Sequence, residues 1–517
     1  MIGTEVDMPG KRTAILIAVL LLGTGLLSGC DRWFEDDSHQ LLRIGHQSNI
    51  STLDQYATTM RATLDMGYLI WDPLLARDPD TGSIKPHLVT RWEVIEPTVW
   101  RFKLREGVSF HNGNLLTAEA VRFTVMDYLL KSERSQRKSQ FDWISNVRVI
   151  DEHTFEIHTS KPYPLILERL NTLFPYDPSV AITDEGPQAW VGTGPYRLVR
   201  FDPGSEVVLS ANKTYWRTGY PKIDNLQIRM ITDTERRLDQ LLNGDLDLAM
   251  NLSPDHWSRL TTSEGISAMD IPVLRIVFWQ FDSMGRASET PLTDPRVRQA
   301  IWHAIDTKAI VDKVFGSRAD PLDSPVNPVQ FGFVSDLDTP EYSPVKARRL
   351  LRQAGYAKGF DIKLWYYLEE QHLFNLAAKE YLEQVGIRLD LQDYRGRQRE
   401  LGALHKGGKV DGIANYTWGS YNLFDVDGIL PDWFMLDRKY NYTGDSRLSG
   451  WLRQARFEVG HFKRKALYDK AVRRIVDQAY WMPNYVMHRI WGRRSDLNLV
   501  VGRDEVARLA EASYVRD

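Results

Sequence analysis

The chain contains a single cysteine, Cys30, among its 517 residues, and this scarcity strongly constrains how it can fold. One cysteine cannot form an intramolecular disulfide and cannot supply the several thiolates of a zinc site. The fold must therefore be stabilised by a packed hydrophobic core, and 43% of the residues are hydrophobic. The length is sufficient for two or three domains.

The residues before Cys30 have the order of a secretory leader. Lys11 and Arg12 are followed by an apolar stretch from Ala14 to Leu27, and small residues precede the cysteine. This stretch is shorter than the roughly 20 apolar residues of a membrane-spanning helix, so an uncleaved membrane anchor is the weaker interpretation. A charged start, an apolar middle and small residues at the cut predict a signal peptide. The run Leu27-Ser28-Gly29-Cys30 resembles a bacterial lipoprotein signal, which implies cleavage before Cys30 and a lipid on its thiol.

The lipoprotein resemblance also implies a location. We expect residues 1–29 to be a signal peptide and residues 30–40 to be a lipidated tether. By resemblance to enterobacterial lipoproteins, Asp31 implies retention on the periplasmic side of the inner membrane. In other bacteria the lipid implies a place on the outer face of the cell membrane.

The charge balance and the absence of catalytic motifs restrict the function. Lys and Arg number 65 and Asp and Glu number 68, so a net charge of −3 gives no general attraction to nucleic acid. The sequence has no G-x-S-x-G, H-E-x-x-H, P-loop or G-x-G-x-x-G motif, and its 12 histidines show no i,i+4 pair. We therefore predict no catalytic residues, no metal site and no cofactor.

Strand and helix patterns alternate after residue 41, which predicts an α/β fold with mixed sheets. Residues 100–105 alternate apolar side chains with cations, as a half-buried strand does. Asp294-Pro295, Asp306 and Ser343-Pro344 predict the starts of helices, because each places a capping side chain before a helical pattern. A further helix is predicted over about 373–385, and the alternation across 360–415 predicts a partly parallel sheet.

Six local motifs occur in an order and spacing that cover most of the chain. They are Thr52-Leu53-Asp54 with Trp71-Asp72-Pro73-Leu74-Leu75, Lys85-Pro86-His87-Leu88 with Arg91-Trp92-Glu93, Phe102 to Gly113, Leu116 to Val121, Gly192-Thr193-Gly194-Pro195-Tyr196, and Leu292 to Ala300 with Ala304-Ile305-Asp306. Together they resemble the extracellular solute-binding proteins of the peptide/nickel class, family 5. These are large three-domain receptors of ABC importers.

The resemblance implies a two-lobed periplasmic-binding-protein fold with a hinge between the lobes. We expect a first lobe at 41–270 with an inserted subdomain at about 73–190, a second lobe at 271–483, and a return to the first lobe at 484–517. Ile271-Pro272 and Met482-Pro483 are the expected crossings, because proline ends regular structure. The implied function is capture of a peptide-like solute by a monomeric receptor, which delivers it to an ABC permease and ATPase.

The predicted ligand contacts fall in three segments, after the first strand, at the strand end near 365, and near 418. They are Asn49, Ser51, Thr52, Tyr56, Trp365, Tyr366, Tyr367, His372, Tyr416, Trp418, Asn422, Asp425 and Asp427.

The sequence departs from the family pattern at two charged positions. By resemblance, dipeptide-binding relatives carry an aspartate where Asn422 lies here, and an arginine where Glu369-Glu370-Gln371-His372 lies here. A plain dipeptide would lose two charge-assisted bonds of about 1.5–3 kcal/mol each. The sequence leaves open, as alternative ligands, a longer or blocked peptide and an amide-rich or cationic solute. Glu369, Glu370, Asp425 and Asp427 could favour a cation, but a solvated acidic face is the stronger interpretation of each. A metal-chelate receptor and a solute sensor without transport also fit the sequence.

Overall fold

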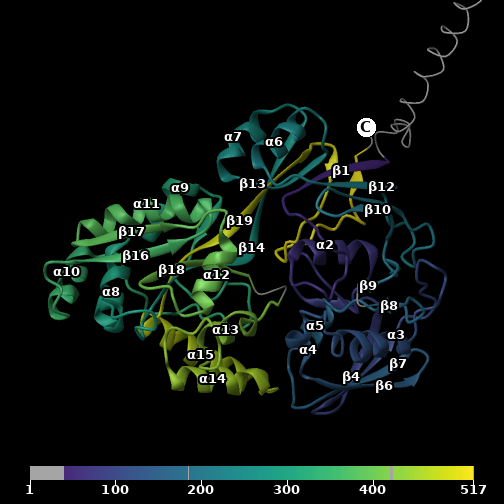
Figure 1. Cartoon of the computed structure of the whole chain (residues 1–517), viewed down its shortest axis with the longest axis horizontal. Coiled ribbons are helices and arrows are strands. Elements are labelled where there is room, and N and C mark those ends of the chain that lie inside the picture. Colours follow the sequence, from purple (N-terminus) through teal and green to yellow (C-terminus); the bar gives the residue numbers. More distant parts are fainter. Residues whose placement is uncertain (1–39, 184, 420–422, 516–517) are drawn as a thin grey trace, which may run out of the picture.

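The computed structural model describes residues 40–183, 185–419 and 423–515. A large mixed sheet is the spine of this part of the chain and continues from one half of the molecule into the other (Figure 1). Its strands lie in the order β10 (Tyr196–Asp202), β11 (Glu206–Ala211), β12 (Asn225–Met230), β1 (Leu41–His46), β13 (Leu248–Leu252), β19 (Trp481–Arg494), β14 (Ile266–Phe281), β18 (Ile413–Trp418), β16 (Phe360–Tyr366) and β17 (Ile387–Asp393). The short strand β15 (Ala319–Pro321) also pairs with β19.

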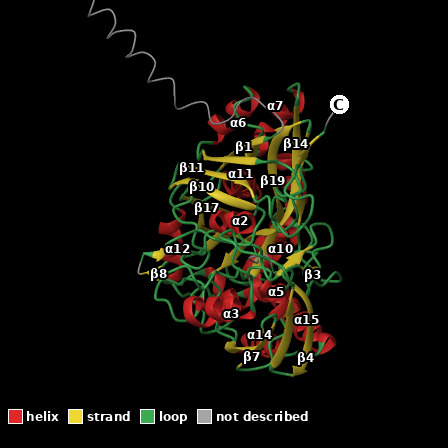
Figure 2. Cartoon of the chain, turned by 90° about the vertical axis from the view of Figure 1, so that its right-hand side faces the viewer, coloured by secondary structure: helices red, strands yellow, loops and turns green. Residues whose placement is uncertain are grey.

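The two halves of the sheet meet at the long strands β14 and β19. These strands are antiparallel neighbours, and Figure 2 shows them side by side. Pro272 and Pro483 lie inside the strands, so the expectation that they end regular structure is wrong. Each proline lies beside a register shift of the strand pairing. Proline has no N–H and cannot donate a hydrogen bond to the neighbouring strand, so it is tolerated within a sheet at a bulge.

The bulge in β14 forms a backbone hydrogen bond with the C-terminal part of the chain. Pairing with β19 is interrupted between Pro272 and Ile276. Within the bulge, the Leu274 N–H donates to the carbonyl oxygen of Arg503 over 3.1 Å. A bulge leaves backbone groups unpaired, and this bond satisfies one of them. The segment around residue 505 therefore lies against β14.

The first lobe is built on the part of the sheet from β10 to β13. β1 pairs in parallel with both β12 and β13, and β11 pairs antiparallel with β10 and β12. Helices of this lobe are α2 (Arg61–Ile70), α6 (Thr234–Leu242) and α7 (Trp257–Thr262). The chain returns here at its end, where β20 (Leu497–Asn498) pairs with β21 (Ser513–Tyr514).

A separate antiparallel sheet extends the first lobe. Its strands lie in the order β4 (Val89–Glu96), β5 (Val99–Leu104), β7 (Thr154–Thr159) and β6 (Ile144–Asp151). The strand predicted at 100–105 is β5. Glu156 on β7 is buried, and Arg101 and Arg148 each donate to it over 2.8 Å, so its charge is paired.

Short elements surround this sheet. They are β2 (Leu75–Arg77), β3 (Ile84–Pro86), α3 (Ala118–Arg122), a π-helical turn (Phe123–Leu129), α4 (Lys138–Phe141), α5 (Ile166–Leu170), β8 (Ile182–Thr183) and β9 (Gly186–Pro187).

The second lobe combines β16, β17 and β18 with eight of the helices that the structure describes. They are α8 (Pro295–Ala304), α9 (Thr307–Phe315), α10 (Pro344–Gln353), α11 (Glu369–Glu383), α12 (Gln398–Lys406), α13 (Leu430–Phe434), α14 (Ser446–Phe457) and α15 (His461–Asp477). The predicted starts after Asp294, Asp306 and Ser343 are confirmed, and each of these side chains accepts a backbone N–H of its helix. The helix predicted at 373–385 begins earlier, at Glu369. β16 pairs in parallel with β17 and β18, as predicted.

Helices and strands alternate in both lobes, and this confirms the predicted mixed α/β fold with two lobes (Figures 1 and 2). Within the described ranges, no helix is both long and apolar enough to cross a bilayer. Over the same ranges, no group of three or more His, Cys, Asp and Glu side chains is arranged to hold a metal ion.

Candidate functional site

An arginine cluster lies beside the bulge of β14 and consists of Arg61, Arg275, Arg489 and Glu505. Arg275 Nε donates to Glu505 Oε1 over 2.8 Å, and Arg489 Nε donates to Glu505 Oε2 over 3.3 Å. Arg61, on α2, acts on Glu505 through its charge and pairs with Asp65 over 2.7 Å. Both long strands, α2 and the C-terminal segment therefore contribute to one charged group.

Glu505 is held as a carboxylate in an unusual backbone conformation. Burial raises the pKa of the Glu505 carboxyl, but Arg275, Arg489 and Arg61 outweigh burial and lower the pKa to about 2. Its φ of 62° lies in the left-handed region, which costs a residue with a side chain on the order of 1–3 kcal/mol. The Glu505 N–H donates to the Gly502 carbonyl over 2.9 Å. These bonds hold the carboxylate in a defined place between the two arginines.

Aromatic residues of the second lobe border the arginine cluster. Tyr367 directly follows β16, and its ring lies 5.4 Å from the ring of Tyr416 on β18. The charges of Arg275 and Arg489 both act on the Tyr367 hydroxyl, which places it near the arginines. Burial raises the pKa of Tyr367 to about 12, so its hydroxyl stays protonated. The hydroxyl donates to the Thr417 carbonyl over 3.5 Å and lies near the two cations.

Trp418 is the last residue of β18 and lies next to this group. Its Nε1 donates to the Gly428 carbonyl over 3.1 Å, and its ring meets the rings of Trp433 and Tyr440 edge-on at 5.3 and 5.6 Å. At the next position, Gly419, a Cβ would lie 2.9 Å from Arg275 Cγ. Gly419 therefore lies directly against Arg275.

The structure separates the other predicted residues near 365. Trp365 faces the same side of the sheet as Trp418, and its Nε1 donates to the Asp411 carbonyl over 2.8 Å. Tyr366 points to the opposite side, because successive side chains of a strand alternate. Its hydroxyl and His372 Nδ1 share a hydrogen bond of 2.7 Å. Tyr367, Tyr416 and Trp418 are thus brought together, while Tyr366 and His372 lie on the other face.

The predicted segment after β1 is partly exposed. Asn49 and Ser51 are exposed, and Thr52 is half-buried with its hydroxyl accepting the Asp54 N–H over 3.1 Å. Tyr56 is fully buried, and its hydroxyl donates to the Phe174 carbonyl over 2.7 Å. This placement gives Tyr56 a packing role in the first lobe.

The acidic residues after β18 are buried beside arginines. Asp425 accepts a hydrogen bond from Arg464 Nη2 over 2.8 Å, and Asp427 lies 3.8 Å from Arg456 Nε. The expectation of a solvated acidic face is therefore wrong for Asp425 and Asp427. Glu369 is exposed and pairs with Arg395. Asp425 and Glu369 are therefore paired, whereas the two carboxylate oxygens of Asp427 are buried without a hydrogen-bond partner among the described residues.

Phe424, the residue before Asp425, makes a contact between the lobes. The Phe424 N–H donates to Glu168 Oε2 over 3.3 Å, and the Arg77 guanidinium lies 4.4 Å from the centre of the Phe424 ring. A Cβ at Gly82 would overlap the same ring, and Gly82 has a φ of 70°. Phe424 belongs to the second lobe and the other three residues to the first. The two lobes are therefore in direct contact.

Two of the predicted site residues, Cys30 and Asn422, lie outside the described residues.

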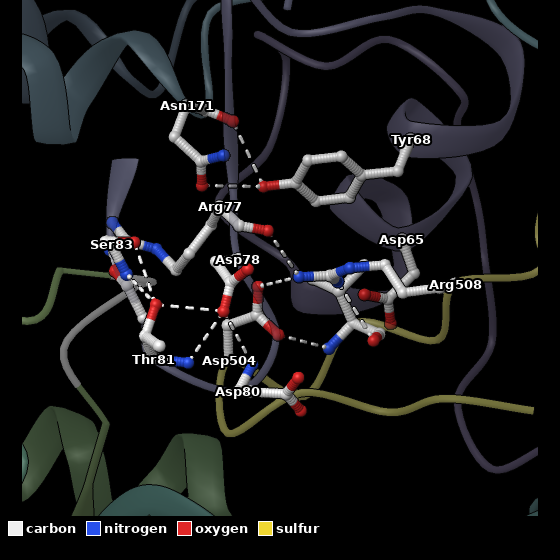
Figure 3. A network of polar contacts seen from close by, with 12 residues as sticks. Asp65, Tyr68, Arg77, Asp78, Asp80, Thr81, Ser83, Asn171, Asp504 and Arg508 are labelled. Atoms are coloured by element: carbon white, nitrogen blue, oxygen red, sulfur yellow. Dashed lines mark hydrogen bonds and ion pairs between the residues drawn. The ribbon is translucent and has the colours of Figure 1, made fainter. Parts of the chain in front are cut away.

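A cavity of about 530 Å³ lies in the first lobe beside the C-terminal segment. α2, the β2–β3 hairpin, residues 215–217 and residues 504–511 all contribute to its lining. Figure 3 shows the polar network at its wall, where Tyr68 donates to the Asn171 carbonyl over 3.1 Å and Arg508 donates to Asp504 over 2.8 Å. None of the predicted contacts lines this cavity.

The sequence did not reveal the arginine cluster or the cavity. Arg61, Arg275, Arg489 and Glu505 are isolated in the chain, and no short motif contains them. Only the sheet order places β14 beside β19 and brings the C-terminal segment to the bulge. The one local signal was Pro272, which marks the bulge.

Comparison with known proteins agrees with this architecture. The model of the "Bacterial extracellular solute-binding proteins, family 5 Middle" matches residues 83–439. The chain is 25% identical over 485 residues to the glutathione-binding protein GsiB of Escherichia coli, covering 90% of this chain and 92% of that protein.

Solved structures show the same fold at lower identity. NikA from Brucella suis in complex with Fe(III)-EDTA has a TM-score of 0.83 at 20% identity, covering 92% of this chain and 99% of that one. A dipeptide binding protein from Pseudoalteromonas in complex with Met-Leu has a TM-score of 0.78 at 21% identity, covering 92% and 100%. The family match spans well over half of the chain. The protein therefore belongs to the family 5 bacterial extracellular solute-binding proteins.

Proposed function

We propose that the protein is a lipid-anchored receptor that captures a peptide-like solute between its lobes and delivers it to the permease and ATPase of an ABC importer. The observation that carries this proposal is the meeting of the arginine cluster with Tyr367 and Trp418 at the crossing strands. A solute held there contacts both lobes together. It binds the closed arrangement better than an open one and shifts the population towards closure.

The side chains at this place suit a small peptide-like molecule. Trp418 is half-buried, and its ring offers a large, stiff surface that suits the apolar side chains of a peptide. The similarity to a glutathione-binding protein and to a dipeptide complex supports this class of solute. The family consists of binding proteins for transport, so we propose no catalytic role.

A metal-chelate receptor is the second candidate. The similarity to NikA in complex with Fe(III)-EDTA favours it, because such a chelate presents carboxylates to its receptor. The arginine cluster is suited to those groups as well as to a peptide. The same experiment separates the two candidates.

Calorimetric titration and X-ray scattering test the proposal together. The purified protein is titrated with glutathione, trialanine, Met-Leu and nickel–histidine, and its radius of gyration is measured with and without each. We expect micromolar or tighter binding of at least one peptide, with a fall in the radius of gyration. Binding of nickel–histidine alone favours the chelate receptor. The capture proposal fails if no solute binds and none compacts the protein.

Attachment to the membrane is tested separately through Cys30. The motif Leu27-Ser28-Gly29-Cys30 supports lipid attachment at this residue. We expect Cys30→Ser to release a soluble form, measured by fractionation of cells into membranes and soluble extract. Ser28→Thr keeps the thiol and serves as the control. Membrane association of Cys30→Ser equal to that of the unchanged protein contradicts the anchor.

A further inference from the structure

The cavity of about 530 Å³ is formed by the first lobe alone and has no part in the proposed capture of a solute. Its lining residues all lie within 68–87, 105–217 and 504–511, so the second lobe and the long strands β14 and β19 do not contribute to it. Ligand pockets have volumes of about 300–1,000 Å³. This cavity is therefore large enough for a small organic molecule.

Among the lysines and arginines of the cavity wall, Arg105 is the one that forms no ion pair with a described residue. The other four are paired with carboxylates, Arg77 with Glu168, Lys85 with Asp78, Arg217 with Glu511, and Arg508 with Asp504, the last pair being visible in Figure 3. The charge of Arg105 is thus left for a partner that enters the cavity.

The Arg105 side chain is held in place while the outer edge of its guanidinium group stays open. Its Nε donates to the His87 carbonyl over 3.1 Å, and the guanidinium carbon lies 4.4 Å from the centre of the Trp216 ring. The terminal nitrogens are not among the buried, unpaired atoms of the described chain, so these N–H groups reach the open cavity. A donor group fixed before binding loses little entropy when a ligand arrives.

The buried carboxylate of the same wall, Asp72, is already satisfied. It forms hydrogen bonds of 2.8–3.1 Å with four side chains, His87, Tyr215, Trp216 and Thr193. A carboxylate has about four acceptor positions, so Asp72 has none left for a ligand. The cavity therefore offers an open cation but no open carboxylate at this place, and it favours an anion over a cation.

We propose that this cavity is an accessory binding site for a small organic anion, whose carboxylate binds the terminal nitrogens of Arg105. A planar guanidinium group presents its N–H donors in a fork that matches the two oxygens of a carboxylate. Tyr68, Pro73, Pro86 and Leu509 also line the cavity and provide apolar surface for the body of the molecule. The inference goes beyond the capture of a solute, because it uses no residue of the crossing strands.

The test compares an aromatic acid with its uncharged amide. Naphthoate and naphthamide are titrated calorimetrically into the full protein, Arg105→Gln and Arg399→Gln. We expect the unchanged protein to bind naphthoate with a Kd of about 1 mM or tighter, and at least tenfold more tightly than naphthamide, as one charge-assisted bond provides. Arg105→Gln loses this preference, while its affinity for naphthamide is unchanged.

Arg399→Gln is the matched control. Arg399 is exposed on α12 in the second lobe and forms no ion pair with a described carboxylate. Its replacement removes one unpaired positive charge from the surface, as Arg105→Gln does, but leaves the cavity intact. This variant keeps the full preference for naphthoate, which separates binding at Arg105 from a general attraction of the protein to anions.

A crystal of the unchanged protein locates the ligand directly and decides the outcome if Arg105→Gln does not fold. The crystal is soaked with bromonaphthoate, and the bromine is placed by its anomalous scattering. We expect the bromine inside the cavity and the carboxylate within hydrogen-bond distance of the terminal nitrogens of Arg105.

Three results overturn the inference. They are equal affinity of the unchanged protein for naphthoate and naphthamide or no binding of either, a folded Arg105→Gln that keeps the preference, and bromine bound only outside the cavity. All three leave the proposed capture of a solute between the lobes intact, since that function is tested with peptides and a chelate.

Discussion

Trp418 is held at the end of β18 by its ring and its indole N–H rather than by charge. The ring meets Trp433 and Tyr440 edge-on, and Nε1 donates to the Gly428 carbonyl. These contacts fix one edge of the ring against the second lobe, and the side chain is only half-buried. A half-buried aromatic residue fixed in this way suits an anchor for a bound molecule, because little rotamer entropy is lost on binding.

We expect Trp418→Ala to weaken solute binding by about 1–3 kcal/mol, which is typical of an aromatic anchor. The measurement is a calorimetric titration with the tightest solute of the panel. Trp92→Ala is the matched control, because Trp92 is half-buried on β4, in the separate sheet of the first lobe. An unchanged affinity of Trp418→Ala removes this residue from the site.

At the scale of elements, β15, β14 and β19 are joined by one histidine. His488 on β19 bonds through Nδ1 to Asp270 on β14 over 2.8 Å and through Nε2 to Asp320 on β15 over 3.1 Å. Burial lowers the pKa of His488, but the hydrogen bonds to Asp270 and Asp320 outweigh burial and raise it. A protonated imidazole donates from both nitrogens, so the charged form holds three strands together.

This arrangement predicts that His488 stabilises the fold mainly at low pH. A group with a raised folded pKa contributes its full stabilisation below its unfolded value of 6.5, and loses it as the pH rises through the folded value. We expect His488→Gln to be less stable than the unchanged protein at pH 5.5, by on the order of 1 kcal/mol. The measurement is urea unfolding at pH 5.5 and 8.5.

The difference between the two proteins should shrink at pH 8.5. His461→Gln serves as the control, because His461 is exposed at the start of α15 and forms no ion pair with a described carboxylate. A difference of equal size at both values of pH contradicts a role for the charged imidazole.

Local elements were more predictable than the candidate site. The helices after Asp294, Asp306 and Ser343 were predicted because a cap depends on residues within one turn. The start of α11 at Glu369 was missed, because Leu368, the residue before it, is not a preferred cap. The arginine cluster depends on strand order and on the bulge of β14. Residues separated by more than two hundred positions in the sequence meet there. A local sequence pattern carries no information about contacts between residues so far apart in the chain.

At the scale of the whole molecule, the lobes touch through Phe424. Its ring lies over the Arg77 guanidinium and against Gly82, and its N–H donates to Glu168. All of these partners belong to the first lobe. An interaction made only when the lobes are in contact stabilises the closed arrangement and contributes to solute affinity through the closed population.

We expect Phe424→Ala to increase the radius of gyration without solute and to weaken solute binding by about tenfold, since a cation–π contact and its packing are lost. Solution scattering and calorimetry measure the two effects. Phe462→Ala is the control, because Phe462 is 87% exposed on α15. Unchanged scattering and affinity in Phe424→Ala contradict a role for this contact in closure.

The position of β19 in the large sheet has a consequence for biosynthesis. It lies between β13 and β14, yet it comes later in the chain than every other strand of that sheet. Until residues 481–494 have been made, β13 and β14 present unpaired apolar edges, which are prone to join other chains. Neither lobe can be completed during synthesis of the preceding residues. A product truncated before Trp481 would therefore aggregate rather than yield one folded lobe.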